Sequence, residues 1–399
     1  MSERDFIPII KPLMGEPEAE AARRPILSGW VTQGPEVAAF EREFAAAVGA
    51  PHACAVSNCT TALHLALLAL GVGRDDEVIT VSHSYIATAN CIRYCGAVPV
   101  FVDIEPDTCN MNPDLLEAAL TPRTRAILCV HQVGMPANLE GILSVAARHS
   151  IPVLEDAACA IGSEIRWKGQ WESIGKPHAD IACFSFHPRK ILTTGDGGML
   201  TTANPKFDAR FRLLRQHSMS VTDAVRHKSS QVTFEEYPEL GYNYRMTDIQ
   251  AAVGREQLKR LPEILSRRRQ LAARYHELFG AVPGITIPFE PPYARANWQS
   301  YCIRIPEACD QREVMQYLLD HGIASRRGIM CSHREAAYKS GQARLAGSLR
   351  ESEAAQDRSI ILPLYHQMTP EEQDRVVATV AEALACESTA GSTARGSLR

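Results

Sequence analysis

The chain has 399 residues, of which 22% are charged, and its formal net charge is −4. This length suits one large domain with a smaller one beside it, and the weak acidity gives no reason to expect nucleic acid binding. The 12 cysteines form no CxxC pair, so we expect reduced thiols in a cytoplasmic protein and no metal site. No run approaches the roughly 18 apolar residues of a membrane span, and no signal-type apolar core follows the charged start.

Apolar runs alternate with helix-like stretches through the first two thirds of the chain. Buried strands are expected at residues 78–81, 98–102, 126–130, 151–154, 181–186 and 198–202. Helices are expected among them, at residues 60–70, 87–94, 113–120 and 139–149. The alternation predicts an α/β fold in which helices cover both faces of a mostly parallel sheet, with ligand-binding residues at the carboxyl ends of the strands.

The last third has the pattern of a smaller α/β region. A helix is expected over residues 247–278, with Thr247 as its N-cap and Pro262 marking a kink or break. Next come a proline-rich connector at 283–292, a strand at 298–305, and helices at 312–321 and 369–384. The expected division is a large domain over 1–265, a small C-terminal domain over 266–386, and a disordered tail, rich in small and polar residues, over 387–399.

Two polar residues that follow predicted strands suit the chemistry of pyridoxal 5′-phosphate (PLP). Asp156 lies just beyond the apolar run at 151–154, and Lys190 lies in a segment of hydroxyls and glycines. PLP needs a lysine that forms a Schiff base with its aldehyde, and a carboxylate that keeps its ring nitrogen protonated so that the ring acts as an electron sink. Taken alone, a lysine lies in solvent far more often, and an aspartate at a strand end is often a turn former. The hypothesis therefore depends on the other groups that PLP requires.

A phosphate site is predicted at the start of the helix expected at residues 60–70. Ser57, Cys59 and Thr60 lie directly before an apolar helix, where hydroxyls and unpaired amide N–H groups can hold an anion. Taken alone, this segment is more simply an N-cap. Ser185, shortly before the lysine, adds a hydroxyl for the same phosphate. Tyr85, in the loop after an early strand, is placed to stack on the pyridine ring.

Ordered stretches along the chain then carry a resemblance to a known family. They lie at residues 28–35, 57–66, 85–90, 100–104, 155–158, 185–190, 240–247, 298–301 and 362–365. From about residue 29 to 377, the chain resembles the DegT/DnrJ/EryC1/StrS aminotransferases, the sugar aminotransferase branch of the fold type I PLP enzymes. So many matches in the same order make the signal specific to that family.

The resemblance implies a role for each residue of the cofactor site. Lys190 would form the Schiff base, and Asp156 would pair with the pyridine nitrogen. Tyr85 would stack on the ring, while Thr60 and Ser185 would bind the phosphate. The fold implied is that of fold type I, with a large PLP-binding domain and a smaller C-terminal α/β domain.

The resemblance also implies a homodimer with shared active sites. Asn243 would reach the phosphate from the neighbouring subunit, although from the sequence alone it is only a loop residue ahead of a helix. The segments that line the substrate pocket in relatives contain Trp30, His187, Arg189, His217 and Arg327.

Three positions depart from the family pattern. Cys59 stands where many members have Gly, which indicates a different phosphate loop that keeps its amide donors. Cys159, within the cofactor site, stands where many have a Gln that contacts the ring hydroxyl, so a water or another residue would have to replace that hydrogen bond. Gln132 and Val133 stand where a Leu–Tyr pair is common, and they change the wall on the substrate side.

The sequence therefore predicts a PLP-dependent aminotransferase that moves an amino group from an amino acid, with L-glutamate the first choice, to a keto sugar. A nucleotide-linked keto-deoxysugar, in amino-sugar, polysaccharide or antibiotic biosynthesis, is the acceptor that the family favours. A keto-cyclitol or another non-nucleotide ketone stays open as the acceptor.

Three other functions are weighed against this one. A PLP-dependent sugar dehydratase carries His at the lysine position, so Lys190 argues against it. A non-catalytic binding or regulatory protein is disfavoured by Lys190, Asp156 and Asn243. A nicotinamide-dependent oxidoreductase would need a G-x-G-x-x-G motif after an early strand, which the sequence lacks.

Overall fold

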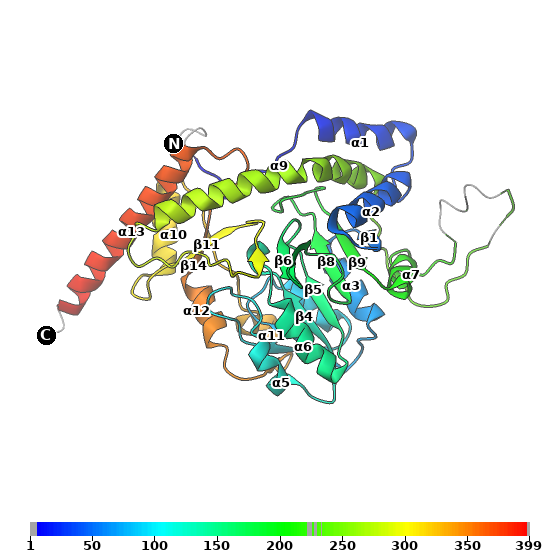
Figure 1. Ribbon diagram of the computed structural model, residues 1–399, viewed down its shortest axis with the longest axis horizontal. Coiled ribbons are helices and arrows are strands. Elements are labelled where there is room, and N and C mark those ends of the chain that lie inside the picture. Colours follow the sequence, from blue (N-terminus) through cyan, green and yellow to red (C-terminus); the bar gives the residue numbers. More distant parts are fainter. Residues whose placement is uncertain (1–5, 222–225, 227–229, 233, 397–399) are drawn as a thin grey trace.

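A computed structural model describes residues 6–221, 226, 230–232 and 234–396, with 387–396 described as backbone alone. The helices are α1 (Glu16–Ser28), α2 (Pro35–Val48), α3 (Cys59–Ala69), α4 (Ala87–Tyr94), α5 (Leu116–Ala119), α6 (Leu139–His149), α7 (Pro205–Leu214), α9 (Asp248–Phe279), α10 (Gln311–Asp320), α11 (Ala336–Lys339), α12 (Arg350–Arg358) and α13 (Pro370–Gly396). The strands are β1 (His52–Val56), β2 (Glu77–Val81), β3 (Val98–Val102), β4 (Thr124–Val130), β5 (Val153–Asp156), β6 (Glu164–Trp167), β7 (Gln170–Ser173), β8 (Ile181–Ser185), β9 (Gly198–Thr202), β10 (Ala294–Arg295), β11 (Tyr301–Arg304), β12 (Arg326–Arg327), β13 (Arg344–Leu345) and β14 (Ser359–Leu362). Figure 1 shows the central sheet beneath the long helix α9, with α13 running out to the C-terminus.

Eight strands form the central sheet, in the order β1-β9-β8-β5-β4-β2-β3-β13. β9 is antiparallel to both of its neighbours, and the remaining strands run parallel to one another. The mostly parallel sheet predicted from the sequence is thereby confirmed. Each of the six predicted strands is found, with ends within two residues of the expected ones.

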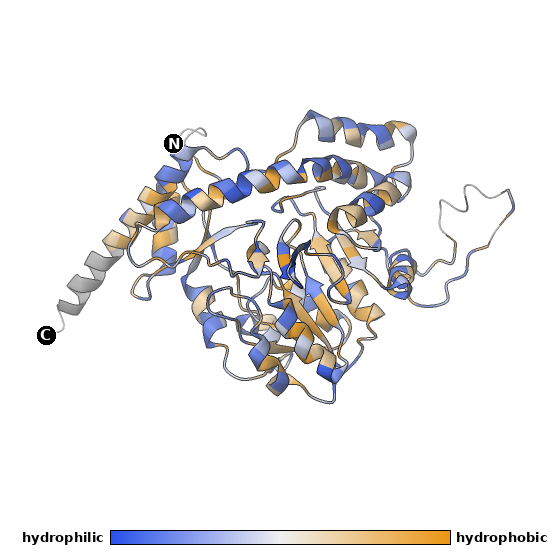
Figure 2. Ribbon diagram, viewed as in Figure 1, coloured by the Kyte–Doolittle hydropathy of each residue, from blue (hydrophilic) through white to orange (hydrophobic). Residues whose placement is uncertain are grey.

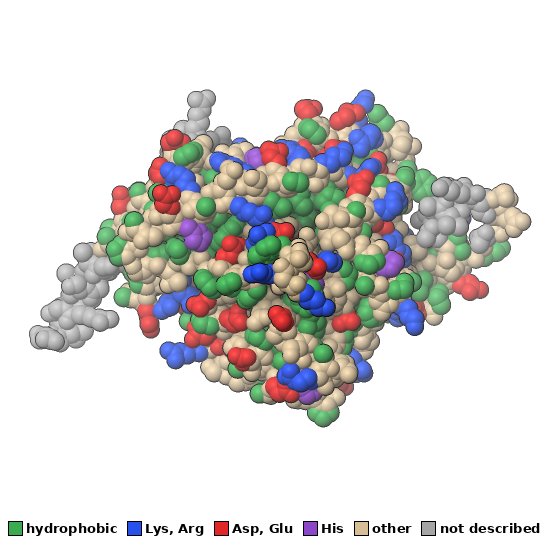
Figure 3. Space-filling model, viewed as in Figure 1, with side chains coloured by type: hydrophobic (Ala, Val, Ile, Leu, Met, Phe, Trp, Pro, Cys, Tyr) green, Lys and Arg blue, Asp and Glu red, His purple; other side chains and the backbone are tan. Residues whose placement is uncertain are grey.

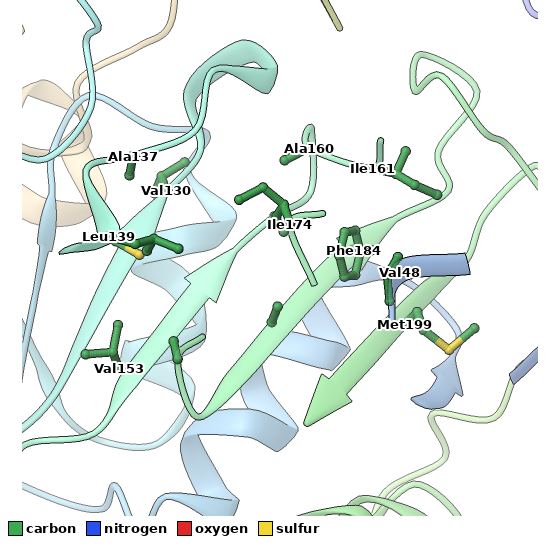
Figure 4. Packing of buried hydrophobic residues seen from close by; sticks show 14 of the residues in the cluster. Val48, Val130, Ala137, Leu139, Val153, Ala160, Ile161, Ile174, Phe184 and Met199 are labelled. Carbon is green, nitrogen blue, oxygen red and sulfur yellow. The ribbon is translucent and has the colours of Figure 1, made fainter. Parts of the chain in front are cut away.

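Successive residues of a strand pack against different helices, which is why the strands read as continuous apolar runs. In β8, Ala182 and Phe184 join the core beneath α2, α6 and α9, whereas Ile181 and Cys183 join the core beneath α3, α4 and α7. Figure 4 shows Phe184 on the first of these faces with side chains from neighbouring strands. Figure 2 shows the same layering by hydropathy, with apolar strands inside and polar positions along the outer helices.

Pro262 does not break the helix in which it lies. α9 begins at its N-cap Thr247, whose side chain accepts a hydrogen bond from the Gln250 N–H, and it continues past Pro262 to Phe279. Proline removes one helical hydrogen bond and crowds the preceding turn. Leu261 and Ile264, on either side of it, are buried in the core of the large sheet, so tertiary packing outweighs the local penalty.

A second core lies under the far end of α9. There Leu271, Tyr275 and Phe279 pack with the three-stranded sheet β11-β14-β12 and with α10 and α13. The predicted boundary after residue 265 falls within α9, between its contacts with the two cores, and it remains a prediction. Segments cross that boundary in both directions: Ile7 packs in the small core, β13 pairs with β3 at the edge of the large sheet, and Ala355 of α12 is buried in the large core.

Several elements differ from those expected. Residues 113–120 form a 3-10 turn and the short α5, and the strand expected at 298–305 is limited to β11 because Trp298 has a left-handed backbone, with φ 56°. α1, α2, β1 and α7 were not among the predicted elements. The expected tail at 387–399 overlaps the last turns of α13 as far as Gly396, while residues 397–399 lie outside the described residues, so the tail also remains a prediction.

Candidate active site

The loops that follow the parallel strands gather at the carboxyl edge of the sheet, below α9 in Figure 1. β5 and β8 are neighbours in register, with Asp156 opposite Cys183. Asp156 ends β5, and the loop after β8 carries Lys190. The sheet therefore brings together the two residues on which the sequence hypothesis rests.

Asp156 is a buried carboxylate, 5% exposed, with a donor on each oxygen. The Thr88 hydroxyl donates to Oδ2 at 2.7 Å, and the Ala158 N–H donates to Oδ1 at 3.2 Å. Burial raises the pKa of Asp156 above its ordinary value, while these two hydrogen bonds and the Lys190 charge act in the opposite direction. A cation placed beside this carboxylate would be held strongly, because the surroundings screen little. Thr88, from α4, was not identified from the sequence.

Lys190 is half-buried, and its Nζ lies 2.9 Å from the Sγ of Cys159. Burial lowers the pKa of the Lys190 amine, but Cys159, Cys59 and Asp156 favour the charged form, and the net shift is upward. The Lys190 amine is therefore protonated at neutral pH. Cys159, placed in the cofactor site by the resemblance, therefore accepts a hydrogen bond from the Lys190 amine.

The predicted phosphate site is the N-terminus of α3. Asn58 is the N-cap, and its side chain accepts the Thr61 N–H at 2.9 Å, while the Ser57 hydroxyl lies 3.3 Å from the Thr61 hydroxyl. The first-turn N–H groups of Cys59 and Thr60 have no partner within the helix and point out of its N-terminus. These donors, with the positive end of the helix dipole, form a site for a phosphate.

The order of the strands brings Ser185 close to the N-terminus of α3. Gly198 pairs with Val56 on one side and with Ser185 on the other. A Cβ added at Gly198 would lie 2.5 Å from the Asn58 carbonyl carbon and 2.8 Å from the Cys59 nitrogen. The absence of a side chain at Gly198 therefore allows the Ser185 strand end and the start of α3 to approach each other.

Tyr85 and Asn243 are both exposed within the single chain. Tyr85, 65% exposed, lies just before α4 in the loop after β2. Asn243 pairs through its backbone with Gln216, and the next residue, Tyr244, accepts a hydrogen bond from the Ser57 N–H at 2.8 Å. The segment that holds Asn243 thus runs beside the phosphate loop. The stacking and partner-subunit roles remain predictions.

The expected substrate residues lie on several elements. His187 and Arg189 share the Lys190 loop, and burial together with the Arg189 charge lowers the pKa of His187. Trp30 donates to the Gln33 carbonyl between α1 and α2. His217 follows α7, and Arg327 lies on β12 with its guanidinium 3.6 Å from Glu335. Their contacts with a substrate remain predictions.

Gln132 and Val133 line a cavity of about 70 Å³ between the large-domain loops and β11. The Gln132 amide donates to the His83 carbonyl. Val133 has φ 47°, an uncommon backbone conformation for a β-branched residue. His83 lines the same cavity, and burial lowers its pKa to about 3, so its ring is neutral. The departure from the family pattern therefore lies at the junction of the two domains.

A buried His–Glu pair supports the strand end that carries Asp156. His131 Nδ1 accepts the Ala137 N–H at 3.0 Å, so its Nε2 carries the proton and donates to Glu155 at 2.9 Å. The His131 N–H donates to the Asp156 carbonyl. His131 and Glu155 were not among the residues predicted from the sequence, although both lie at the ends of adjacent predicted strands, where a polar residue after an apolar run is a possible signal.

Other kinds of site find little support among the described residues. No group of three or more His, Cys, Asp and Glu side chains there could hold a metal ion. Over the same part of the chain, no helix has the length and apolar character needed to cross a membrane. On the face shown in Figure 3, positive and negative side chains are interspersed.

Comparison with known proteins gives consistent relatives. The model of the DegT/DnrJ/EryC1/StrS aminotransferase family matches residues 12–381. The spore coat polysaccharide biosynthesis protein SpsC of Bacillus subtilis (strain 168) is 38% identical over 379 residues, which are 94% of this chain and 96% of SpsC. Spr1654 from Streptococcus pneumoniae, solved in its PMP form, has a TM-score of 0.88 and 29% identity, over 96% of this chain and 99% of that one. DesI, solved in the presence of its TDP-sugar product, has a TM-score of 0.85 and 29% identity, over 98% of this chain and 96% of that one.

These matches confirm the fold type I architecture, and the residues present fit PLP. A buried carboxylate at the end of β5, a lysine after the neighbouring β8, and the N-terminus of α3 after β1 supply the groups that the ring nitrogen, the aldehyde and the phosphate require. The chain belongs to the DegT/DnrJ/EryC1/StrS aminotransferase family and is a PLP-dependent transaminase.

Proposed function

We propose that this enzyme moves the amino group of L-glutamate to a keto group of a sugar carried by a nucleoside diphosphate. The pairing of buried Asp156 with Lys190 at adjacent strand ends is the observation that carries the transamination. Support for the sugar comes from relatives: SpsC is named for polysaccharide biosynthesis, and DesI has a TDP-sugar product. We also propose a cytoplasmic location, which the free thiols of all 12 cysteines favour.

Each residue of the site has a defined task in this reaction. When bound, PLP supplies an aldehyde that captures the amino group and a ring that withdraws electrons from the donor's α carbon. Lys190 would hold that aldehyde at rest, and its amine, once released, would take the proton from the donor's α carbon. Asp156 would keep a proton on the ring nitrogen through its negative charge. The N–H groups of Cys59 and Thr60 and the Ser185 hydroxyl bind the phosphate.

The same residues distinguish transamination from dehydration. A displaced lysine amine can both remove and return a proton, so the amino group leaves the donor and enters the acceptor through one base. Lys190 supplies this amine, whereas the related dehydratases carry His at its position. We therefore do not adopt the dehydratase alternative.

A homodimer with shared sites is part of the proposal. Val232, Phe234, Tyr237 and Leu240 are large apolar residues with 88%, 87%, 56% and 80% exposure, and they lie just before Asn243. Exposed apolar side chains grouped in one segment are typical of a surface that another protein covers. This segment projects from the body of the chain at one side of Figure 1. In the dimer, this segment would pack against the partner subunit, and Asn243 would bind the phosphate in the partner's active site.

Mixing two inactive variants tests the shared site. In a heterodimer of Lys190→Ala and Asn243→Ala chains, one site would combine a normal Lys190 with a normal Asn243 from the other chain. We expect mixing with subunit exchange to restore part of the activity, whereas each variant alone stays inactive. A mixture that exchanges subunits yet stays as inactive as its components would show that Asn243 acts within its own chain.

The acceptor is tested with the amino form of the cofactor. Purified enzyme should carry a yellow chromophore that L-glutamate bleaches, and this spectrum should change in Lys190→Ala. Bleached enzyme is then mixed with nucleotide-linked keto sugars and with free keto-cyclitols, and the return of the chromophore is recorded. Return with a nucleotide-linked ketone supports the proposal. If the chromophore returned only with a free keto-cyclitol, the acceptor would be a cyclitol ketone, and the proposal of a nucleotide-linked sugar would be wrong.

A further inference from the structure

Gln299 contacts the main chain on both sides of Lys190. Its Oε1 accepts the Ile191 N–H at 3.0 Å, and its Nε2 donates to the Arg189 carbonyl at 2.5 Å. Gln299 is 6% exposed, so these contacts are shielded from water. One primary amide thus uses its acceptor and a donor on the two peptide groups next to the reactive lysine.

The segment that carries Gln299 belongs to the connection into the small domain, and it is held firmly. Buried Arg268 of α9 donates to the Trp298 carbonyl at 2.8 Å and to the Gln299 carbonyl at 2.6 Å. The Gln299 N–H donates to Asn297 Oδ1 at 2.8 Å. The left-handed backbone of Trp298, φ 56°, turns the chain between these contacts. Such a backbone persists only where its surroundings fix it.

Asn297 holds the other partner of the lysine. Its Nδ2 donates to the Cys159 carbonyl at 2.7 Å and to the Ile161 carbonyl at 2.8 Å. Cys159 is the residue whose sulfur lies 2.9 Å from Lys190 Nζ. Two side chains of one short segment, Asn297 and Gln299, therefore fix the two loops whose side chains meet at the amine.

The lysine loop also has supports of its own: the Phe186 N–H donates to the Gly197 carbonyl, the Thr194 N–H donates to the Phe186 carbonyl, and Leu192 is fully buried. The loop runs from the end of β8 to Gly198 and contains three glycines, at 195, 197 and 198. A proton transfer loses about 10²-fold in rate when the reacting groups shift by about 1 Å. Among the contacts of this loop, those of Gln299 act on the two peptide groups that flank Lys190.

We infer that Gln299 is a positioning residue for Lys190: its amide clamps the peptide groups of Arg189 and Ile191, and so fixes where the lysine amine stands. This inference rests on the proposed function, in which Lys190 carries the reaction. It also makes the small domain a supplier of active-site geometry, because Arg268 and Asn297 fix the clamp.

The test compares Gln299→Ala and Gln299→Glu with a matched control, Gln373→Ala. Gln373 is also a buried amide in the small domain, and it donates to the Leu271 carbonyl away from the lysine loop. In Gln299→Ala we expect the rate of chromophore bleaching by glutamate to fall about 10²-fold. The affinities for glutamate and for pyridoxamine phosphate should change less than about threefold, because neither is bound by Gln299. Gln299→Glu keeps the acceptor for Ile191 but sets a buried carboxylate oxygen against the Arg189 carbonyl, so its loss should be at least as large.

Two readouts separate positioning from a general structural role. The pH titration of the PLP chromophore reports the surroundings of the Lys190 nitrogen, and it should shift in both Gln299 variants but not in Gln373→Ala. In protein free of PLP, amide hydrogen exchange over residues 186–197 should speed up in the Gln299 variants alone. Wild-type rates and an unshifted titration in Gln299→Ala would overturn the inference. So would failure of both Gln299 variants to fold while Gln373→Ala folds, because Gln299 would then be structural.

Failure of the proposed function would look different. Wild-type protein loaded with PLP would then keep its spectrum after glutamate is added, whatever residue stands at 299. If wild-type protein is bleached and the Gln299 variants behave like it, the clamp alone is wrong.

Discussion

The two sides of the active site differ in how much of their structure one chain supplies. On the cofactor side, Asp156 is 5% exposed and Lys190 is paired with Cys159. On the side predicted to meet the substrate, Arg189 and Arg327 are exposed. The chain holds Asp156 and Lys190 by its own contacts, whereas Arg189 and Arg327, two of the residues predicted to meet the substrate, face outward.

This difference matches the division of labour in a transaminase. The proton transfers are common to every donor and acceptor, so the groups that perform them can be held rigidly. The groups that meet the acceptor face a surface that the partner subunit would complete under the proposal. Changes on the cofactor side should therefore impair both half reactions, whereas changes on the substrate side should impair only the acceptor half.

Asp156→Asn should have the largest effect. The amide keeps the shape of the side chain but removes the charge that holds the ring nitrogen protonated, so the rate of the glutamate half reaction should fall by about 10²- to 10⁴-fold. Thermal unfolding should change little, since the Asn carbonyl can still accept from Thr88. Stopped-flow absorbance and a melting curve measure the two quantities. Turnover within tenfold of wild type would show that the carboxylate is not the partner of the ring.

Gly198→Ala should have the second-largest effect, because it disturbs the predicted phosphate site. The new Cβ would lie within 2.8 Å of Asn58 and Cys59 backbone atoms, so the start of α3 must shift. Such overpacking costs about 1–3 kcal/mol. If that cost falls on cofactor binding, the Kd for pyridoxamine phosphate rises about 10- to 100-fold. Gly73→Ala is the control, because a Cβ there has open space around it. Equal affinities in the two variants would remove Gly198 from the phosphate site.

Arg327→Ala tests the substrate side. The guanidinium is 3.6 Å from Glu335, with its side chain 52% exposed, and such a surface pair adds little stability. We expect the KM for a nucleotide-linked acceptor to rise about tenfold, while the glutamate half reaction is unaffected. Arg312→Ala, an exposed arginine at the start of α10, serves as the control. A slower glutamate half reaction would contradict the separation of the two sides.

The cofactor side was largely predictable because its signals are local. Asp156 and Lys190 each follow an apolar strand directly, and the order of strands and helices indicates where parallel strands end. The sequence also contains local signals for α1 and α2, which were not predicted. Each helix begins with a proline in its first turn and ends at a left-handed glycine, Gly29 or Gly49.

The supports of the site could not be predicted in the same way. Gln299 lies 108 residues after Ile191, and nothing in its own segment indicates that its amide turns back to the lysine loop. Thr88 has the appearance of an ordinary helical threonine until the sheet brings β2 and β5 to the same edge. β13 is only two residues long, so it has no periodicity to recognise. These contacts follow from packing over long sequence separations.

Thr88→Val should change the pH dependence more than the maximum rate. The Thr88 hydroxyl holds down the pKa of Asp156, which burial raises, so removing it should raise that pKa further. Turnover requires the carboxylate anion, and it is lost as the pH falls through this pKa. The acid limb of kcat should therefore move to higher pH, with a smaller change on the plateau. Thr201→Val is the control, because Thr201 is also buried but its hydroxyl donates to the Gly175 carbonyl and not to a carboxylate. An unmoved acid limb would show that Thr88 only packs.

Cys159→Gln should have the smallest effect, and its sign distinguishes two roles for the sulfur. The family resemblance implies a glutamine here that contacts the ring hydroxyl, so restoring it should tighten PLP retention by roughly 3- to 10-fold, the value of one net hydrogen bond. Cys159→Ser is too short to reach that hydroxyl and should bring no gain. If glutamine instead slows the glutamate half reaction in proportion to its displacement of the Lys190 amine, the 2.9 Å contact between sulfur and nitrogen is part of how this chain holds its lysine. In that case Cys159 and Gln299 would hold Lys190 together. Asn297 fixes the loop that carries Cys159, and Gln299 fixes the loop that carries Lys190.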